Sequence, residues 1–306
     1  MNGFLNLIKP AGMTSHDAVV WFRKLSGERK TGHLGTLDPM ATGVLPLALG
    51  SSRKLTEYLI EKDKEYEAEF TFGITTDTGD VTGEVVSRKD CSGLTKDRVL
   101  GMLPLLTGEI TQVPPMYSAV KVSGRKLYEL ARRGETVQPK PRKVMVYEFS
   151  LVKWREGVSP RATFHLRVGK GTYVRALAQS LGELAGTGAT VSRLQRTRAG
   201  PFRIQDGYSP EKILQLKRSG KLDEALLPPT KCLPEFPAFP VGPDVIQAVK
   251  NGAPLEASLI PGAVRNVLSS SGHPGLFFLM DRNGEVVALM RLEDDRIRYE
   301  KVLITS

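Results

Sequence analysis

The sequence of 306 residues has few of the side chains from which disulfides and metal sites are built. It contains two cysteines, Cys91 and Cys232, which are too far apart in the chain for a CxxC metal motif or a disulfide framework. The four histidines also lack the HExxH spacing of a zinc enzyme. We therefore expect no metal site.

Long apolar runs are missing as well. The longest, Val44–Leu49, is far too short to span a bilayer. The N-terminus, MNGFLNLIKP, lacks the basic start and long apolar core of a signal peptide. These absences predict a protein without a membrane partner, and the scarcity of cysteine favours the reducing cytoplasm as its compartment.

Acidic residues are outnumbered by basic ones. The chain has 43 Lys and Arg against 33 Asp and Glu, a net charge of +10, and its pI is near 9.6. This balance favours a polyanionic partner, nucleic acid first and an anionic membrane surface second. The length suggests one large domain or two ordinary ones, and a hydrophobic content of 41% is typical of a soluble globular protein.

The stretch Gly32–Pro46, GHLGTLDPMATGVLP, presents one carboxylate, Asp38, and one imidazole, His33. Pro39 disfavours a helical conformation at Asp38, and the glycines allow close approach of a ligand to the backbone, so a rigid presenting loop is one interpretation. The other is a helix start, with Asp38 as its N-cap and Pro39 as its first residue. The residues alone leave both open.

This stretch resembles the catalytic loop of the TruB-type tRNA pseudouridine synthases. Their motif is Gly-His-x-Gly-x-Leu-Asp-Pro-x-Ala-x-Gly-x-Leu, and every fixed position is matched from Gly32 to Leu45. The resemblance implies that Asp38 is the nucleophile and that His33 fills or braces the space left by a flipped uridine. The stretch KPAGMTSHDAVV resembles the family's opening motif, in which His16 is structural.

The segment Lys64–Gly73 alternates apolar and polar residues with the period of a half-buried strand. Tyr66 lies on the apolar face, and by itself this position favours an ordinary core tyrosine. The resemblance instead implies an active-site tyrosine that stacks on the base, with Lys64 two residues earlier as a substrate-binding residue.

A further motif, GTYVRAL, begins a helix that the spacing of leucines predicts will end at Gly186. Thr172 is a candidate N-cap. Arg175 falls in the first turn, where a cation opposes the helix dipole, so we expect either a solvent-facing side chain or a compensating buried carboxylate. The resemblance implies that Arg175 pairs with Asp38 and holds it ionised, and that Tyr173 shapes the pocket wall.

The segment 121–143 is the most basic part of the chain, with eight basic side chains against two acidic ones. One interpretation is a solvated helix face. A hinged insertion that clamps a phosphate backbone is the other, and it is the one that the resemblance supports, since this region matches the family's mobile thumb. Arg132 and Arg133 are its candidate RNA-binding residues.

The segment Ser192–Phe202 carries three arginines and no acid, and we interpret it as a strand edge that faces phosphates. It resembles the family element Leu-x-Arg-Thr-x-x-Gly-x-Phe, which makes Leu194 a substrate-binding candidate. The arginines are Arg193, Arg196 and Arg198.

Pro-rich Leu227–Pro243 predicts a domain boundary. We expect a catalytic domain over 1–232 and a C-terminal domain over 237–306. Short strands in the latter, such as Leu276–Met280, suggest a small β-barrel that by position resembles a PUA-type RNA-binding module. With seven basic and eight acidic residues from Phe236 onward, it would bind through shape or stacking.

The resemblance as a whole implies an α+β pseudouridine-synthase fold with a mixed, mainly antiparallel sheet flanked by helices. It also implies a monomeric, guide-RNA-independent isomerase that needs no cofactor and that flips and converts a uridine in the T-loop of tRNA. The alternatives are an RNA chaperone without dominant catalysis and a guide-RNA-dependent synthase. A hydrolytic N-glycosidase would need a second carboxylate near Asp38, which the loop does not offer.

Overall fold

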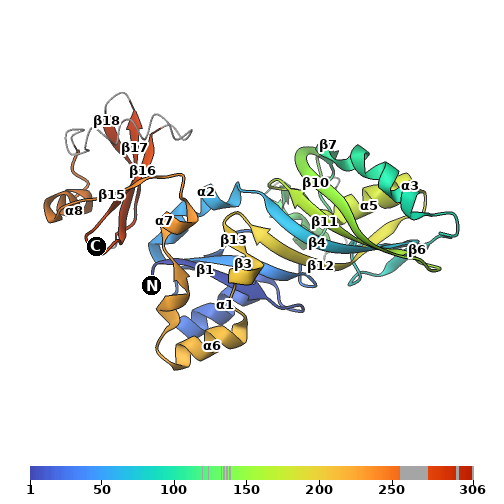
Figure 1. Cartoon of the computed structure of the whole chain (residues 1–306), viewed down its shortest axis with the longest axis horizontal. Coiled ribbons are helices and arrows are strands. Elements are labelled where there is room, and N and C mark those ends of the chain that lie inside the picture. The colour runs from blue at the N-terminus through green and yellow to red at the C-terminus, as the bar shows by residue number, and fades with distance from the viewer. Residues whose placement is uncertain are drawn as a thin grey trace.

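The computed structural model describes residues 1–118, 120–122, 124–131, 133, 135, 137, 139–255, 275–293 and 296–304. They form a large sheet with helices on it and a smaller sheet at the C-terminal end of the chain (Figure 1). No helix of these residues is long and apolar enough to cross a membrane.

The large sheet has ten strands, eight of them in one path. Its described pairs are antiparallel except for β3 against β12, which run parallel. The mixed, mainly antiparallel sheet is thus confirmed. In path order the strands are β14 (Leu226–Leu227), β1 (Gly3–Lys9), β3 (Thr42–Leu49), β12 (Ala189–Ala199), β4 (Lys64–Phe72), β11 (Arg161–Val168), β10 (Arg142–Arg155) and β7 (Gly108–Gln112), with β2 (Thr31–His33) on β3 and β13 (Phe202–Arg203) on β12.

The two longest of the described helices pack into the main core of this sheet. Helix α1 (Ser15–Ser26) begins with a capping box in which Thr14 and Asp17 each accept a backbone N–H from the other. Helix α5 (Val174–Ala185) ends at Gly186, as predicted, in the left-handed conformation that favours glycine. Their apolar faces join the aromatic residues of β4 and β11 in one buried cluster, which fixes the ends of both helices against the sheet.

The remaining elements are short. A 3-10 turn and a short helix without side-chain caps follow β3, because Gly50 turns the chain with a positive φ. These elements are η1 (Gly50–Leu55), α2 (Thr56–Ile60), β5 (Ile74–Thr76), β6 (Val85–Arg88), α3 (Lys96–Met102), η2 (Leu103–Leu106), β8 (Lys121–Val122), β9 (Arg125–Lys126), α4 (Leu127–Ala131), η3 (Ile204–Asp206), α6 (Pro210–Arg218), η4 (Leu222–Ala225), α7 (Pro229–Cys232) and α8 (Pro243–Lys250).

The C-terminal unit is an open four-stranded sheet in the part of the chain that the structure describes, where a closed barrel was expected. Its order is β15 (Ala238–Pro240), β16 (Leu276–Met280), β17 (Val286–Glu293) and β18 (Arg296–Val302). This sheet packs on the unit that holds the large sheet through Phe236, whose ring meets Tyr58 at 5.3 Å and Phe278 at 5.7 Å between centroids. The Tyr58 hydroxyl also donates to Glu300 at 2.8 Å, which ties α2 to β18.

Candidate active site

Asp38 lies in a tight turn between β2 and β3 and does not begin a helix. Its carbonyl accepts the N–H of Ala41 at 3.0 Å, with Pro39 as the second residue of the turn. The hydroxyl of Ser15 holds both backbone groups of Leu37, the residue before Asp38. It accepts from Leu37 N at 2.8 Å and donates to Leu37 O at 3.0 Å. The structure therefore agrees with the presenting loop and not with a helix start at Asp38.

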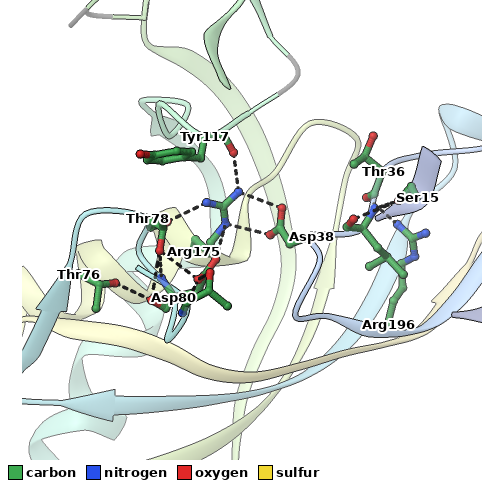
Figure 2. A network of polar contacts seen from close by, with 11 residues as sticks. Ser15, Thr36, Asp38, Thr76, Thr78, Asp80, Tyr117, Arg175 and Arg196 are labelled. Atoms are coloured by element: carbon green, nitrogen blue, oxygen red, sulfur yellow. Dashed lines mark hydrogen bonds and ion pairs between the residues drawn. The ribbon is translucent and has the colours of Figure 1, made fainter. Parts of the chain in front are cut away.

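Arg175 binds the carboxylate of Asp38 through both of its oxygens (Figure 2). Nε lies 2.9 Å from Oδ2 and Nη2 lies 3.0 Å from Oδ1, the two-pronged geometry of a strong ion pair. The guanidinium also donates to the carbonyls of Thr78 at 2.7 Å and Tyr117 at 2.8 Å. Arg175 is only 3% exposed, so its side chain does not face solvent. Asp38 is the compensating carboxylate that we expected for a cation in this first helical turn.

The N-terminal end of α5 differs from the prediction in one detail. The N-cap is Tyr173, which makes no side-chain capping bond, whereas the hydroxyl of Thr172 donates to the carbonyl of Met145 at 3.4 Å. Gln112 takes over part of the capping role, because its side-chain oxygen accepts the N–H of Tyr173 at 3.0 Å. The guanidinium of Arg142 lies over the Tyr173 ring at 5.0 Å, so this tyrosine is held from two sides.

The pKa of Asp38 is raised above its ordinary value of 3.8. Burial is the main cause, and the negative charge of Asp80 adds to it, while Arg175 acts in the opposite direction. Arg175 thus lowers the pKa of this carboxyl, as expected, but the net shift is upward because desolvation outweighs the ion pair. The resemblance implied the partner of Asp38 but not the extent of its burial.

Asp80 is a second carboxylate in the site that sequence reasoning missed. It is 4% exposed and its Oδ2 lies 3.7 Å from Nε of Arg175. Its other oxygen accepts from the hydroxyl of Thr78 at 3.0 Å and from the backbone N–H of Thr82 at 3.0 Å. Figure 2 shows it on the far side of Arg175 from Asp38. The loop TTDTGDVTG carried a possible signal in its alternating Thr and Asp residues, which favour such local bonds.

Lys9 is also part of the site and was not singled out from the sequence. Its side chain is fully buried, and Nζ donates to the carbonyls of Pro10 at 2.8 Å, Met13 at 2.7 Å and Pro39 at 3.3 Å. Burial lowers the pKa of Lys9 from 10.5 to about 8, although the charge of Asp38 works against that shift. The opening motif therefore meets the Asp38 loop through this ammonium.

Tyr66 is 8% exposed and lies on β4, opposite Arg196 of β12 and Leu166 of β11. It belongs to the same buried cluster as Leu37, the residue before Asp38. The ammonium of Lys64 is directed at the backbone, where it donates to the carbonyls of Ile60 and Lys62, and burial lowers its pKa to about 8. This lysine holds the end of α2 in the structure.

His33 ends β2, five residues before Asp38. Burial and the neighbouring charge of Arg196 lower the pKa of this imidazole, which favours the neutral ring. Its Nδ1 is buried without a hydrogen-bond partner in the described part of the chain. Leu194 is buried on β12 and lines an open groove beside Pro39 and Met40.

The arginines of β12 do not form the phosphate-facing edge that the sequence predicted. Arg193 is exposed, but Arg196 is 1% exposed and points into the protein. Arg198 is ion-paired with Asp63 at 2.7 Å and with Glu65 at 2.8 Å. The prediction fails because β12 is a central strand of the sheet, flanked by β3 and β4, so most of its side chains face neighbours.

The two arginines predicted to bind RNA in the basic insertion are only partly described. Arg132 lies outside the described residues, and Arg133, two residues beyond the end of α4, is exposed, with its N–H donating to the carbonyl of Leu130 at 2.9 Å. Within the described residues, no three His, Cys, Asp or Glu side chains gather as a metal-binding group.

The fold and the site can be compared with those of known proteins to find the class of enzyme to which this chain belongs. The chain aligns over 99% of its length with a solved Cbf5–Nop10–Gar1 complex, at a TM-score of 0.70 and 27% identity over 85% of that chain. Residues 23–174 match the model of the TruB family pseudouridylate synthase N-terminal domain, and residues 175–233 match that of the tRNA pseudouridylate synthase B C-terminal domain.

Curated relatives agree with these family models. The chain is 43% identical over 268 residues to the tRNA pseudouridine synthase B of Pelotomaculum thermopropionicum, covering 87% of this chain and 84% of the relative. It is 41% identical over 298 residues to that of Moorella thermoacetica, covering 96% and 94%. The chain belongs to the TruB family of pseudouridylate synthases, and it is an isomerase.

Proposed function

We propose that the chain converts a uridine in the T-loop of tRNA to pseudouridine, without a guide RNA and with Asp38 as the nucleophile. The relatives that are 41–43% identical are named tRNA pseudouridine synthase B, whereas the chain from the Cbf5–Nop10–Gar1 complex is 27% identical. The basic insertion at 121–143 favours a standalone enzyme, since it supplies positive charge for gripping RNA.

The observation that carries this proposal is the two-pronged contact of Asp38 with Arg175. The reaction breaks the bond between C1′ and N1 of the uridine, turns the base and joins C1′ to C5. The C5 hydrogen is lost as a proton, and N1 ends protonated, so the product is an isomer of the substrate. One ionised, directed carboxylate suffices for this chemistry, either as nucleophile or as base.

The other side chains have supporting roles in the proposal. Tyr66 stacks on the flipped base and relays a proton, and Tyr173 forms the pocket wall. His33, kept neutral, fills the space that the base vacates. Leu194 and Lys64 shape the substrate site, the latter by fixing the end of α2. No step calls for a metal or a redox cofactor.

The organisation of the chain is part of the same proposal. Residues 1–232 form the catalytic domain and 237–306 a PUA-like RNA-binding domain, in a monomer that works in the cytoplasm. A tRNA-folding role is a second candidate function, favoured by the same basic insertion, and it is compatible with catalysis.

Tritium release tests the proposal. The protein is incubated with unmodified tRNA that carries tritium at uridine C5, and label entering water is counted. We expect release from the T-loop uridine by the wild-type chain without any added guide RNA. Asp38→Ala should abolish release and retain tRNA binding. Binding and folding of tRNA with no release by the wild type would leave the chaperone as the function.

A further inference from the structure

Arg196 is a buried guanidinium with an unusual set of partners. It is 1% exposed, and among the described residues no carboxylate lies within ion-pairing distance of it. Burying a charge without a counterion costs free energy, so such a residue is normally paired. Here the charge is met by backbone carbonyls alone, and those carbonyls belong to the stretch that carries Asp38.

The guanidinium spans both limbs of that stretch. Nη2 donates to the carbonyl of Gly35 at 3.2 Å and Nη1 to that of Thr36 at 3.3 Å, both before Asp38. Nε donates to the carbonyl of Val44 at 2.7 Å, after it. Figure 2 shows Arg196 and Thr36 on the opposite side of Asp38 from Arg175. One planar fork thus closes the base of the loop by joining residues 35 and 36 to residue 44.

The backbone of Arg196 connects the same elements. It is paired with Gly43 of β3 in the parallel contact and with Tyr66 of β4 in the antiparallel one. A bulge follows directly, between Arg196 and Arg198, and bulges redirect the side chains beside them. The approach of β3 is so close that a Cβ on Gly43 would lie 2.2 Å from the Arg196 carbonyl oxygen.

We propose that Arg196 is a positioning residue, which sets the place of the Asp38 carboxylate relative to Tyr66 by tying both limbs of the loop to β12. This inference rests on the proposed function, because it assumes that Asp38 reacts with the uridine. Reaction rates depend on sub-ångström placement, so a loosened loop lowers the rate of the chemical step and leaves RNA binding intact.

The test measures single-turnover tritium release at saturating enzyme, together with the tRNA Kd, for Arg196→Met and Arg196→Lys. We expect Arg196→Met to lower the rate of the folded protein by about 100-fold with an unchanged Kd. Arg196→Lys keeps the charge but not the fork, and we expect a loss of about 10-fold. Arg198→Met, on the same strand but bonded to Asp63 and Glu65, is the matched control and should keep the wild-type rate.

The pKa of His33 provides a second readout, because the charge of Arg196 adds to burial in lowering the pKa of this imidazole. NMR titration of the ring should give a higher pKa in Arg196→Met and the wild-type pKa in Arg198→Met. If Arg196→Met does not fold, Arg196→Lys decides by rate and Kd. A wild-type rate in either folded variant, or a weaker Kd with an unchanged rate, overturns the inference. A wild-type chain that releases no tritium would refute the proposed function instead.

Discussion

Arg175 and Asp38 are 137 residues apart in the chain, yet two hydrogen bonds of 2.9 and 3.0 Å join their side chains. The same guanidinium is anchored by the carbonyls of Thr78 and Tyr117. Its fork has little freedom left, so it dictates the direction of the carboxylate as well as interacting with its charge.

Replacing Arg175 with lysine should therefore be far from conservative. An ammonium is a point donor and cannot hold both carboxylate oxygens and both carbonyls at once. We expect single-turnover tritium release to fall by about 100-fold or more, with tRNA binding retained. Arg167→Lys is the control, since Arg167, on β11, pairs with Asp63 and not with Asp38. Equal losses in both variants would contradict the role given to Arg175.

When the single-turnover rate is plotted against pH, its fall on the acidic side (the acid limb) should follow the pKa of Asp38. Because burial and Asp80 raise that pKa above 3.8, ionised Asp38 is lost at a higher pH than an ordinary carboxylate as the solution is acidified. Asp80→Asn removes one negative charge, so the pKa of Asp38 should fall and the limb should move to lower pH.

The measurement is the pH dependence of the single-turnover rate. The quantity compared between variants is the pH at the midpoint of the acid limb and not the maximal rate. Asp77→Asn is the matched control, because Asp77 lies in the same loop and accepts a backbone N–H from Glu84. A limb that stays in place in Asp80→Asn would show that another group titrates.

Lys9 should make stability depend on alkaline pH. Its pKa is about 8 in the fold and 10.5 when unperturbed, so between these values the unfolded chain binds the proton and the native chain does not. Raising the pH across this window favours the native state. Relative to Lys9→Met, the wild-type free energy of unfolding should rise by about 3 kcal/mol across it.

Urea denaturation at several pH values gives this difference. Lys143→Met serves as the control, because Lys143 is exposed and the Glu109 carboxylate raises its pKa, so no rise is expected from it in this window. A flat difference between wild type and Lys9→Met would mean that Lys9 stays protonated in the fold.

The thumb assignment predicts a salt effect. Neutralising Arg132 and Arg133 to glutamine should weaken the binding of any tRNA sequence, because phosphate contacts carry no sequence information. It should also reduce the slope of log Kd against log salt by about 1 to 2. Lys217→Gln with Lys212→Gln removes the same charge from α6 and should leave the slope unchanged. An unaltered slope in the arginine variant would refute the thumb assignment.

Local signals in the sequence were most informative where short-range sterics decide the conformation. The alternation in Lys64–Gly73 predicted a strand that the structure has at Lys64–Phe72, and Gly186 marked the end of α5. Local signals in the sequence led to wrong predictions where distant segments of the chain meet. Arg196 looks like a phosphate contact in the sequence, but β3 and β4 enclose it on both sides.

The amino-acid sequence by itself determined the family and the class of fold, because the family's motifs are residue identities at fixed spacings, and the resemblance to that family implied the pairing of Asp38 with Arg175. Tertiary structure alone decided how deeply Asp38 is buried, that Asp80 and Lys9 join it, and which arginine of β12 holds the loop. Desolvation and the coming together of remote segments depend on packing in three dimensions, which no spacing along the chain encodes.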